Sequence, residues 1–457
     1  MVNNKVQSSE FKEKNEAHGP ANCCRAAGTF DRPPCCAQEK PTVSCSKMYY
    51  YELNGHLLAS SVERPGLTPV KPYEAERVFF LTDGDPAKGR GSFRAAHPGQ
   101  LAAPDGLTVL DASRLPSFSL DETLSTALNA GKLTVVNSGR IGWERMLEPC
   151  VPGKKRVNIL AIGDVGATLM MGLKLLGGDV VSRIGICDIA AQLTARWEFE
   201  MGQVALPWDY DAFPEVVIVP PEELFDCDVF VFVASKGIPP VGSQVKDVRM
   251  AQFSANAGLV CQYAHMARKQ GFHGLWAAVS DPVDPLAKVA YLESNLNEEG
   301  EWDGLGFLPE QVQGYGLGVM NARAAYYAKR DQRFASFLTE GRAFGPHGEG
   351  LWIADSLENY NEECSRELTE LTKTANLKIR ELGFKPYVAP ALSSGALSLL
   401  LTLRGEWHYG SVFLDGVYVG CKNRYTPFGL ETELLPAIPD PLYAHLESAV
   451  RTLKSII

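Results

Sequence analysis

Five short apolar runs alternate with segments of helical periodicity between residues 157 and 280, and this pattern constrains the fold more than any other feature. The runs are "VNILAIG", "SRIGICDI", "EVVIV", "DVFVFVAS" and "GLWAAVS". In the helical segment that stops at Gly177-Gly178, the residues spaced for burial are Ala167, Leu169, Met170, Leu173 and Leu176. Apolar strands that alternate with helices pair in parallel, with both faces of the sheet covered. We therefore expect an α/β fold built on a doubly wound parallel sheet.

The pattern changes on both sides of this segment. Residues 46–155 carry short β-type runs, "RVFFLTD", "LTVLDAS" and "KLTVVNSG", between turn-rich pieces, so we expect a small α/β or mostly β module of unassigned role there. The parallel sheet then occupies residues 156–318 and ends with a sixth strand in "VQGYGLG". Beyond it, helical segments, the β-type section "EWHYGSVFLDGVYVG" and a last amphipathic helix predict an α+β domain over residues 319–457.

The first 45 residues have little to pack, and we expect a disordered tail. Five cysteines lie in it, at Cys23, Cys24, Cys35, Cys36 and Cys45. Neither CC pair has the C-x2-C spacing usual for zinc, so we expect no metal site there. The six other cysteines lie in apolar segments and are expected to be buried, reduced thiols.

The charge balance excludes some partners. The formal net charge is -10, which argues against nucleic acid or an anionic membrane as a partner. No apolar run is long enough to span a bilayer, and the first residues lack the apolar core of a secretion signal. We expect a cytoplasmic protein.

The turn after the first apolar strand, "AIGDVG", matches a degenerate G-x-G-x-x-G fingerprint. Gly163 lets the backbone approach a pyrophosphate and Gly166 lets helix and strand pack closely, while Ala161 is tolerated in the first glycine position if its φ is negative. Asp164 suits a diphosphate site only if it faces solvent or a cation. Asp188 ends the second strand, where a carboxylate accepts hydrogen bonds from a ribose, which favours NAD over NADP. The alternative is a glycine-containing turn without a ligand.

Segments from this loop onward resemble the lactate/malate dehydrogenase family, in the same order. They include "VNILAIGDVGATLMMGLKLLGGDVVSRIGICDI", "VRMAQFSANAGLV", "AAVSDPVDPL", "QGYGLGVMNARAAYY" and "GPHGEG", over about residues 156–457. The resemblance implies a Rossmann-type NAD domain, a small 2-hydroxy or 2-oxo acid as substrate and a homo-oligomer, a dimer or tetramer. The cofactor-binding residues that loop and resemblance indicate are Gly163, Asp164, Val165, Gly166, Asp188 and Ala234.

The same resemblance implies the catalytic residues. His347 in "GPHGEG" looks like the family's histidine, which exchanges a proton with the substrate hydroxyl. Arg323 is similar to the arginine that grips the substrate carboxylate, and Arg249 to the arginine that polarises the carbonyl. Taken singly, each residue is equally an ordinary surface arginine or loop histidine.

Two positions depart from the family pattern. Met320 stands where the family has the aspartate that holds the histidine, and a thioether supplies no negative charge. Asp281 stands in "VSDPVD", where the family usually has asparagine. Asp281 either repels an anionic acid or replaces the missing partner of His347. The loop before Arg249 is also unlike the family, and Gln244 and Lys246 are candidate specificity residues there.

Three hypotheses follow. The first is an NAD-dependent 2-hydroxyacid dehydrogenase with His347 as acid and base. The second is a catalytically degenerate, dehydrogenase-like binding or regulatory protein. The third is another enzyme on this scaffold, such as an NAD-dependent glycosidase, although no cysteine and histidine cluster for its metal is visible near "GPHGEG".

Overall fold

The computed structural model describes residues 42–43, 47–102, 105–148, 153–236 and 248–457, with the backbone alone at residues 42–43 and 248–251. Residues 41–457 form one compact unit. The expected tail lies outside the described residues, apart from the short strand β1 (Thr42–Val43), which pairs with β7 (Ser117–Phe118). The domain boundaries expected at residues 46, 156 and 319 stay predictions.

A nine-stranded sheet is the centre of the described part of the chain, in the order β11-β10-β9-β12-β13-β14-β17-β18-β19. Its first six strands are parallel, and the order in which the chain visits them is 3-2-1-4-5-6. They are β9 (Lys155–Leu160), β10 (Val181–Cys187), β11 (Glu215–Ile218), β12 (Val229–Phe232), β13 (Leu275–Ala278) and β14 (Val312–Gly314). The parallel α/β sheet expected from the apolar runs is therefore confirmed.

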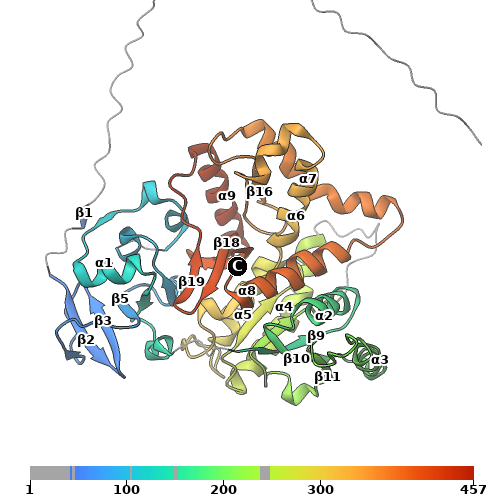
Figure 1. Cartoon of the computed structure of the whole chain (residues 1–457), viewed down its shortest axis with the longest axis horizontal. Helices are drawn as coiled ribbons and strands as arrows, with labels where there is room; N and C mark the ends of the chain where they lie inside the picture. Colours follow the sequence, from blue (N-terminus) through green and yellow to red (C-terminus); the bar gives the residue numbers. More distant parts are fainter. Residues whose placement is uncertain (1–41, 44–46, 103–104, 149–152, 237–247) are drawn as a thin grey trace, which may run out of the picture. The chain divides into compact units, whose positions relative to one another are not determined.

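Helices cover both faces of these strands. Val231 and Ala277 pack into one core with α2 (Asp164–Leu176) and with η8 (Pro390–Leu397) and α8 (Ser398–Arg404). Their neighbours Phe232 and Ala278 point the other way, into a core with α4 (Val248–Lys269) and α5 (Val283–Ser294). Figure 1 shows α2 and α3 (Ala191–Gly202) beside β9, β10 and β11. Of the five residues expected to be buried on α2, Leu176 is instead 51% exposed, because it ends the helix beyond the sheet.

The C-terminal strands extend the same sheet. β17 (His408–Leu414) pairs antiparallel with β14, and β18 (Val417–Thr426) and β19 (Gly429–Thr432) follow. Of the helical segments expected beyond residue 319, the one in "NARAAYYAKRDQRFASFL" (residues 321–338) is broken, since Asp331 caps a new turn by accepting from the Arg333 N–H. The other elements are α6 (Leu317–Ala328), η7 (Gln332–Leu338), β15 (Arg342–Phe344), β16 (Trp352–Ala354), α7 (Glu362–Glu381), α9 (Asp440–Ile456), η5 (Pro221–Glu223) and η6 (Pro309–Gln311).

The N-terminal module has a mixed six-stranded sheet in the order β4-β2-β3-β5-β8-β6. Its elements are β2 (Tyr49–Leu53), β3 (His56–Ser60), β4 (Thr68–Pro69), β5 (Val78–Thr82), β6 (Ser92–Arg94), β8 (Leu133–Asn137), α1 (Glu122–Asn129), η1 (Pro98–Leu101) and η4 (Trp143–Leu147). The expected strand "LTVLDAS" is wrong. It forms two 3-10 turns, η2 (Leu107–Leu110) and η3 (Ala112–Arg114), because the Asp111 side chain caps the second turn at the Ser113 N–H.

Buried polar contacts join this module to the central sheet. The Glu310 carboxylate accepts from the backbone N–H groups of Gly91 at 2.6 Å and Ser92 at 2.8 Å, and burial raises its pKa. Arg140 is 2% exposed and donates to the Tyr291 hydroxyl at 2.9 Å. The module is therefore an integral part of the compact unit.

Five cysteines lie among the described residues, and all are free thiols. Cys187, Cys227 and Cys421 are buried as expected, whereas Cys261 and Cys364 are only half-buried. In the part of the chain that the structure describes, no helix is both long and apolar enough to cross a membrane.

Candidate functional site

The glycine loop joins β9 to the N-terminus of α2. A Cβ at Gly166 would clash with the carbonyl oxygen of Ala161, whereas a Cβ at Gly163 would meet no atom within 4 Å. Gly166 is thus required for close packing of helix and strand, and Gly163 borders open space. Ala161 was expected to be tolerated in the first glycine position only with a negative φ, but its φ is 75°, in the left-handed region. This conformation costs an alanine about 1 kcal/mol.

The acidic residues of the loop region are placed by specific contacts. Asp164 forms an ion pair with Lys385 at 2.9 Å, which supplies the cation that the sequence required. Asp188 closes the loop, since its carboxylate accepts from the Ile162 N–H at 2.8 Å and the Ala190 N–H at 2.9 Å. No side chain among the described residues caps the N-terminus of α2 at Gly163.

This loop fits a dinucleotide. The uncapped backbone N–H groups at Asp164 and Val165 suit a pyrophosphate, and each Asp188 oxygen keeps a lone pair for a ribose hydroxyl. Ala234 lies just beyond the end of β12, and its carbonyl accepts from the Ser280 hydroxyl at 2.8 Å. The hydrogen bond links the ends of two neighbouring parallel strands, β12 and β13.

His347 lies on the loop between β15 and β16, and glycines bring that loop close to α6. Gly345 and Gly350 have φ values of 87° and 86°, which favour glycine. A Cβ at Gly316 would lie 2.6 Å from the Cβ of His347. The close approach lets the Gly316 carbonyl contact Nδ1 of His347 at 2.9 Å. Nδ1 therefore donates its proton to this carbonyl, and Nε2 of the neutral ring is left as an acceptor.

Asp281 is the carboxylate nearest to Nε2 of His347 among the described residues, with its Oδ1 at 3.7 Å. The Asp281 side chain is 52% exposed and that of His347 18% exposed. The Asp281 backbone is held by Asn256, a fully buried residue whose Nδ2 donates to its carbonyl at 2.8 Å. Of the two roles left open for Asp281, this distance favours that of partner to His347.

Asp284 is a further residue of the site that sequence reasoning missed. Its buried carboxylate accepts from the His347 backbone N–H at 2.9 Å and from the Ser411 hydroxyl. Burial raises the pKa of Asp284 to about 6, and both hydrogen bonds oppose that rise. Asp284 thus positions the histidine loop. The available signal was an acid inside the otherwise apolar start of a helix, "VDPLAKVA".

Arg323 and Met320 lie on α6 beside this cluster. Burial lowers the pKa of Arg323, and Tyr327 and Asp281 oppose the change through their charges. The sulfur of Met320 lies 3.7 Å from Nη1 of Arg323, and Met320 itself is 3% exposed. Met320 therefore packs against the arginine and supplies no charge to His347.

The remaining candidates are only partly placed. Arg249 lies in the first turn of α4, but its side chain is outside the described residues. Gln244 and Lys246 also lie outside them. The structure thus brings together His347, Asp281 and Arg323.

Strand order and site together define a class of protein. The doubly wound α/β sheet of the order 3-2-1-4-5-6 recurs in dinucleotide-binding domains, and it carries a cluster of Asp281 after β13, Arg323 on α6 and His347 on the β15–β16 loop. Solved structures of known proteins share this fold. The minor L-lactate dehydrogenase of Enterococcus mundtii superposes with a TM-score of 0.52 at 18% identity, covering 66% of this chain and 97% of that one. The malate dehydrogenase of Archaeoglobus fulgidus, solved in complex with NADH, gives 0.51 at 17% identity, covering 66% and 98%.

Sequence similarity leads to the same group. The L-lactate dehydrogenase of Mesomycoplasma hyopneumoniae is 23% identical over 220 residues, 48% of this chain and 62% of its own length. The malate dehydrogenase of Sulfurimonas denitrificans is 24% identical over 284 residues, 58% of this chain and 81% of its own. No family model matches. Over about two-thirds of its length the chain is related to the lactate and malate dehydrogenase family, and the extra N-terminal region is not covered.

Proposed function

We propose that the chain is an NAD-dependent oxidoreductase that interconverts a 2-hydroxy acid and a 2-oxo acid, with His347 as the acid and base. The observation that carries the proposal is the two-sided environment of this histidine. Its Nδ1 is held by the Gly316 carbonyl, and its Nε2 lies 3.7 Å from the Asp281 carboxylate. This arrangement suits a ring that alternately accepts and returns a proton at Nε2.

Each residue of the cluster has a part in the chemistry. His347 accepts the hydroxyl proton of the acid at Nε2, and Asp281 stabilises the imidazolium that results. Arg323 pairs with the substrate carboxylate, and this pairing offsets the burial of its guanidinium. Arg249 keeps the polarising role that the resemblance implies. NAD bound at the glycine loop would supply the hydride acceptor, and Gly163, Asp164, Val165, Gly166, Asp188 and Ala234 would hold it.

The charge of Asp281 also limits the substrate. A carboxylate beside the reacting hydroxyl repels a second acid group on the substrate, and repulsion between like charges a few ångströms apart is about 1 kcal/mol even in water. We therefore propose a monocarboxylic substrate over a dicarboxylic one such as malate or oxaloacetate. A cytoplasmic homo-oligomer remains the expectation for its assembly and location.

The test is NADH oxidation by the purified full-length chain with a panel of 2-oxo acids, from pyruvate and branched or aromatic acids to oxaloacetate. We expect turnover with at least one monocarboxylic acid and its loss in His347→Asn. A matched control is His265→Asn, because the His265 side chain is 54% exposed on α4 and, among the described residues, forms an ion pair only with Glu293. This control should keep the wild-type rate.

One observation favours the second candidate function, a binding or regulatory protein. Met320 leaves His347 without the buried aspartate of the family, and Asp281 lies outside hydrogen-bond distance. NADH binding without turnover of any acid in the panel would support this candidate and refute the enzyme.

A further inference from the structure

A second edge of parallel strands lies in the N-terminal module. β3, β5 and β8 are parallel, so their carboxyl ends lie together at one edge of the six-stranded sheet. A cavity of about 660 Å³ opens at this edge. Pockets of that size enclose small organic ligands, and α/β sheets bind ligands outside the carboxyl ends of their strands. Nothing in the proposed dehydrogenase function uses this cavity.

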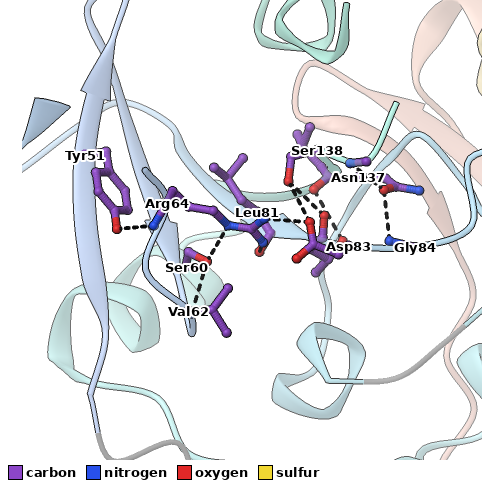
Figure 2. A network of polar contacts seen from close by, with 12 residues as sticks. Tyr51, Ser60, Val62, Arg64, Leu81, Asp83, Gly84, Asn137 and Ser138 are labelled. Atoms are coloured by element: carbon purple, nitrogen blue, oxygen red, sulfur yellow. Dashed lines mark hydrogen bonds and ion pairs between the residues drawn. The ribbon is translucent and has the colours of Figure 1, made fainter. Parts of the chain in front are cut away.

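Asn137, the last residue of β8, supplies a hydrogen-bond donor to the cavity. Its Oδ1 accepts from the backbone N–H of Gly84 at 3.0 Å (Figure 2) and from that of Gly139 at 3.1 Å, which fixes the orientation of the amide. Asn137 lines the cavity and is only 4% exposed, yet its Nδ2 has no acceptor among the described residues. A ligand with an acceptor at this point would complete the hydrogen bonding of the amide.

The charges around the cavity are already balanced. Each cation of the described lining pairs with a lining carboxylate: Arg64 with Asp83 (2.6 Å), Lys88 with Asp85 (3.6 Å) and Arg90 with Asp105. The remaining lining carboxylate, Asp415, pairs with Lys454 at 2.5 Å. A phosphate or an ammonium group would have to break one of these pairs, so the lining favours an uncharged ligand.

The cavity has an aromatic wall and a polar rim. Phe80, Phe93 and Phe118 belong to the wall. Phe80 and Phe118 pack edge to face at 5.7 Å, and the Arg90 guanidinium covers one face of Phe93, 3.5 Å from its ring centroid. Such a wall suits a flat ring. On the rim, the Asp83 side chain is 60% exposed, and it can accept hydrogen bonds from hydroxyl groups while it keeps its ion pair with Arg64 (Figure 2).

We propose that this cavity binds an uncharged nucleoside. The base lies against the phenylalanine wall, a ring nitrogen or carbonyl of the base accepts from Nδ2 of Asn137, and the sugar hydroxyls donate to Asp83. The N-terminal module is then a ligand-binding domain distinct from the glycine loop at β9.

The experiment is isothermal titration calorimetry of the full-length chain with adenosine and uridine, beside their monophosphates and free ribose. At least one nucleoside should bind saturably, and its monophosphate and ribose should bind on the order of tenfold or more weaker. No saturable binding of either nucleoside in the millimolar range would overturn the proposal. Tighter binding of a monophosphate would overturn the uncharged ligand, and equal binding of ribose would overturn the role of the ring.

Two variants separate this cavity from the glycine loop, which could also take adenosine. Asn137→Asp keeps the acceptor for Gly84 and Gly139 and removes the donor, so it should weaken binding on the order of tenfold. Asp188→Ala should leave it unchanged. The reverse pattern would assign the binding to the glycine loop and refute the proposal. If Asn137→Asp does not fold, Asp83→Ala serves instead, since that carboxylate is exposed and its loss should also weaken binding.

Discussion

Asp281→Asn tests whether a carboxylate outside hydrogen-bond distance can serve the histidine. At 3.7 Å, the Coulomb attraction between Asp281 and a protonated His347 is about 1 kcal/mol in water and about 4–5 kcal/mol at an effective dielectric constant of 20. The Asp281 side chain is 52% exposed, so solvent screening places the value near the lower end, at about 1–2 kcal/mol. Neutralising it should lower kcat for oxidation of the hydroxy acid about 5–30-fold.

The same substitution should act on KM in the opposite direction. Removing a negative charge beside an anionic substrate lowers the repulsion in the bound state, so KM for the acid should fall. Initial rates of NADH formation, measured against acid concentration at low and high salt, separate the two effects, and the loss in kcat should shrink as salt screens the pair. Asp226→Asn, which neutralises an exposed carboxylate paired with Arg156, is the matched control. An unchanged kcat in Asp281→Asn, with His347→Asn inactive, would refute this reasoning.

Four further predictions concern the scaffold of the site. Asp284→Ala removes the acceptor of the His347 N–H and should cost about 1–3 kcal/mol in urea unfolding together with a loss of kcat; full activity in this variant would contradict a positioning role. The pKa of Asp284 is raised from 3.8 to about 6, so its charged form disfavours folding. The free energy of unfolding of the wild type should therefore fall as the pH rises from 3.8 to about 6, whereas Asp284→Asn should show a flatter profile. Gly166→Ala should lower Tm and weaken NADH binding on the order of tenfold or more because its Cβ clashes, whereas Gly163→Ala should keep the wild-type Tm. Ala161→Gly should raise the free energy of unfolding by up to about 1 kcal/mol, and no gain would mean that the positive φ carries no strain.

The central sheet could be predicted from the sequence because it depends on the local periodicity of apolar residues. The apolar runs of β9, β10 and β12 have few alternatives to a buried parallel strand. The prediction of a strand in "LTVLDAS" was wrong because its conformation depends on one side-chain cap at Asp111, which outweighs β propensity.

The candidate site could likewise be predicted from the sequence only in part. The glycines around His347 and the acid at Asp281 could be read from the sequence. The Gly316 carbonyl and the Asp284 carboxylate could not, because each reaches His347 across many residues of chain and depends on how α5, α6 and the β15–β16 loop pack. The backbone conformation of Ala161 was likewise invisible, since φ is fixed by the surrounding packing.

The buried Glu310 carboxylate has a consequence for how the molecule melts. It satisfies Gly91 and Ser92 of the N-terminal module, while Arg140 of that module reaches Tyr291 in the central unit. Separating the two parts breaks these buried hydrogen bonds, and that penalty couples their unfolding. Heating should therefore give a single calorimetric peak with matching calorimetric and van't Hoff enthalpies, and the N-terminal region that the dehydrogenase matches do not cover should behave as part of one cooperative folding unit.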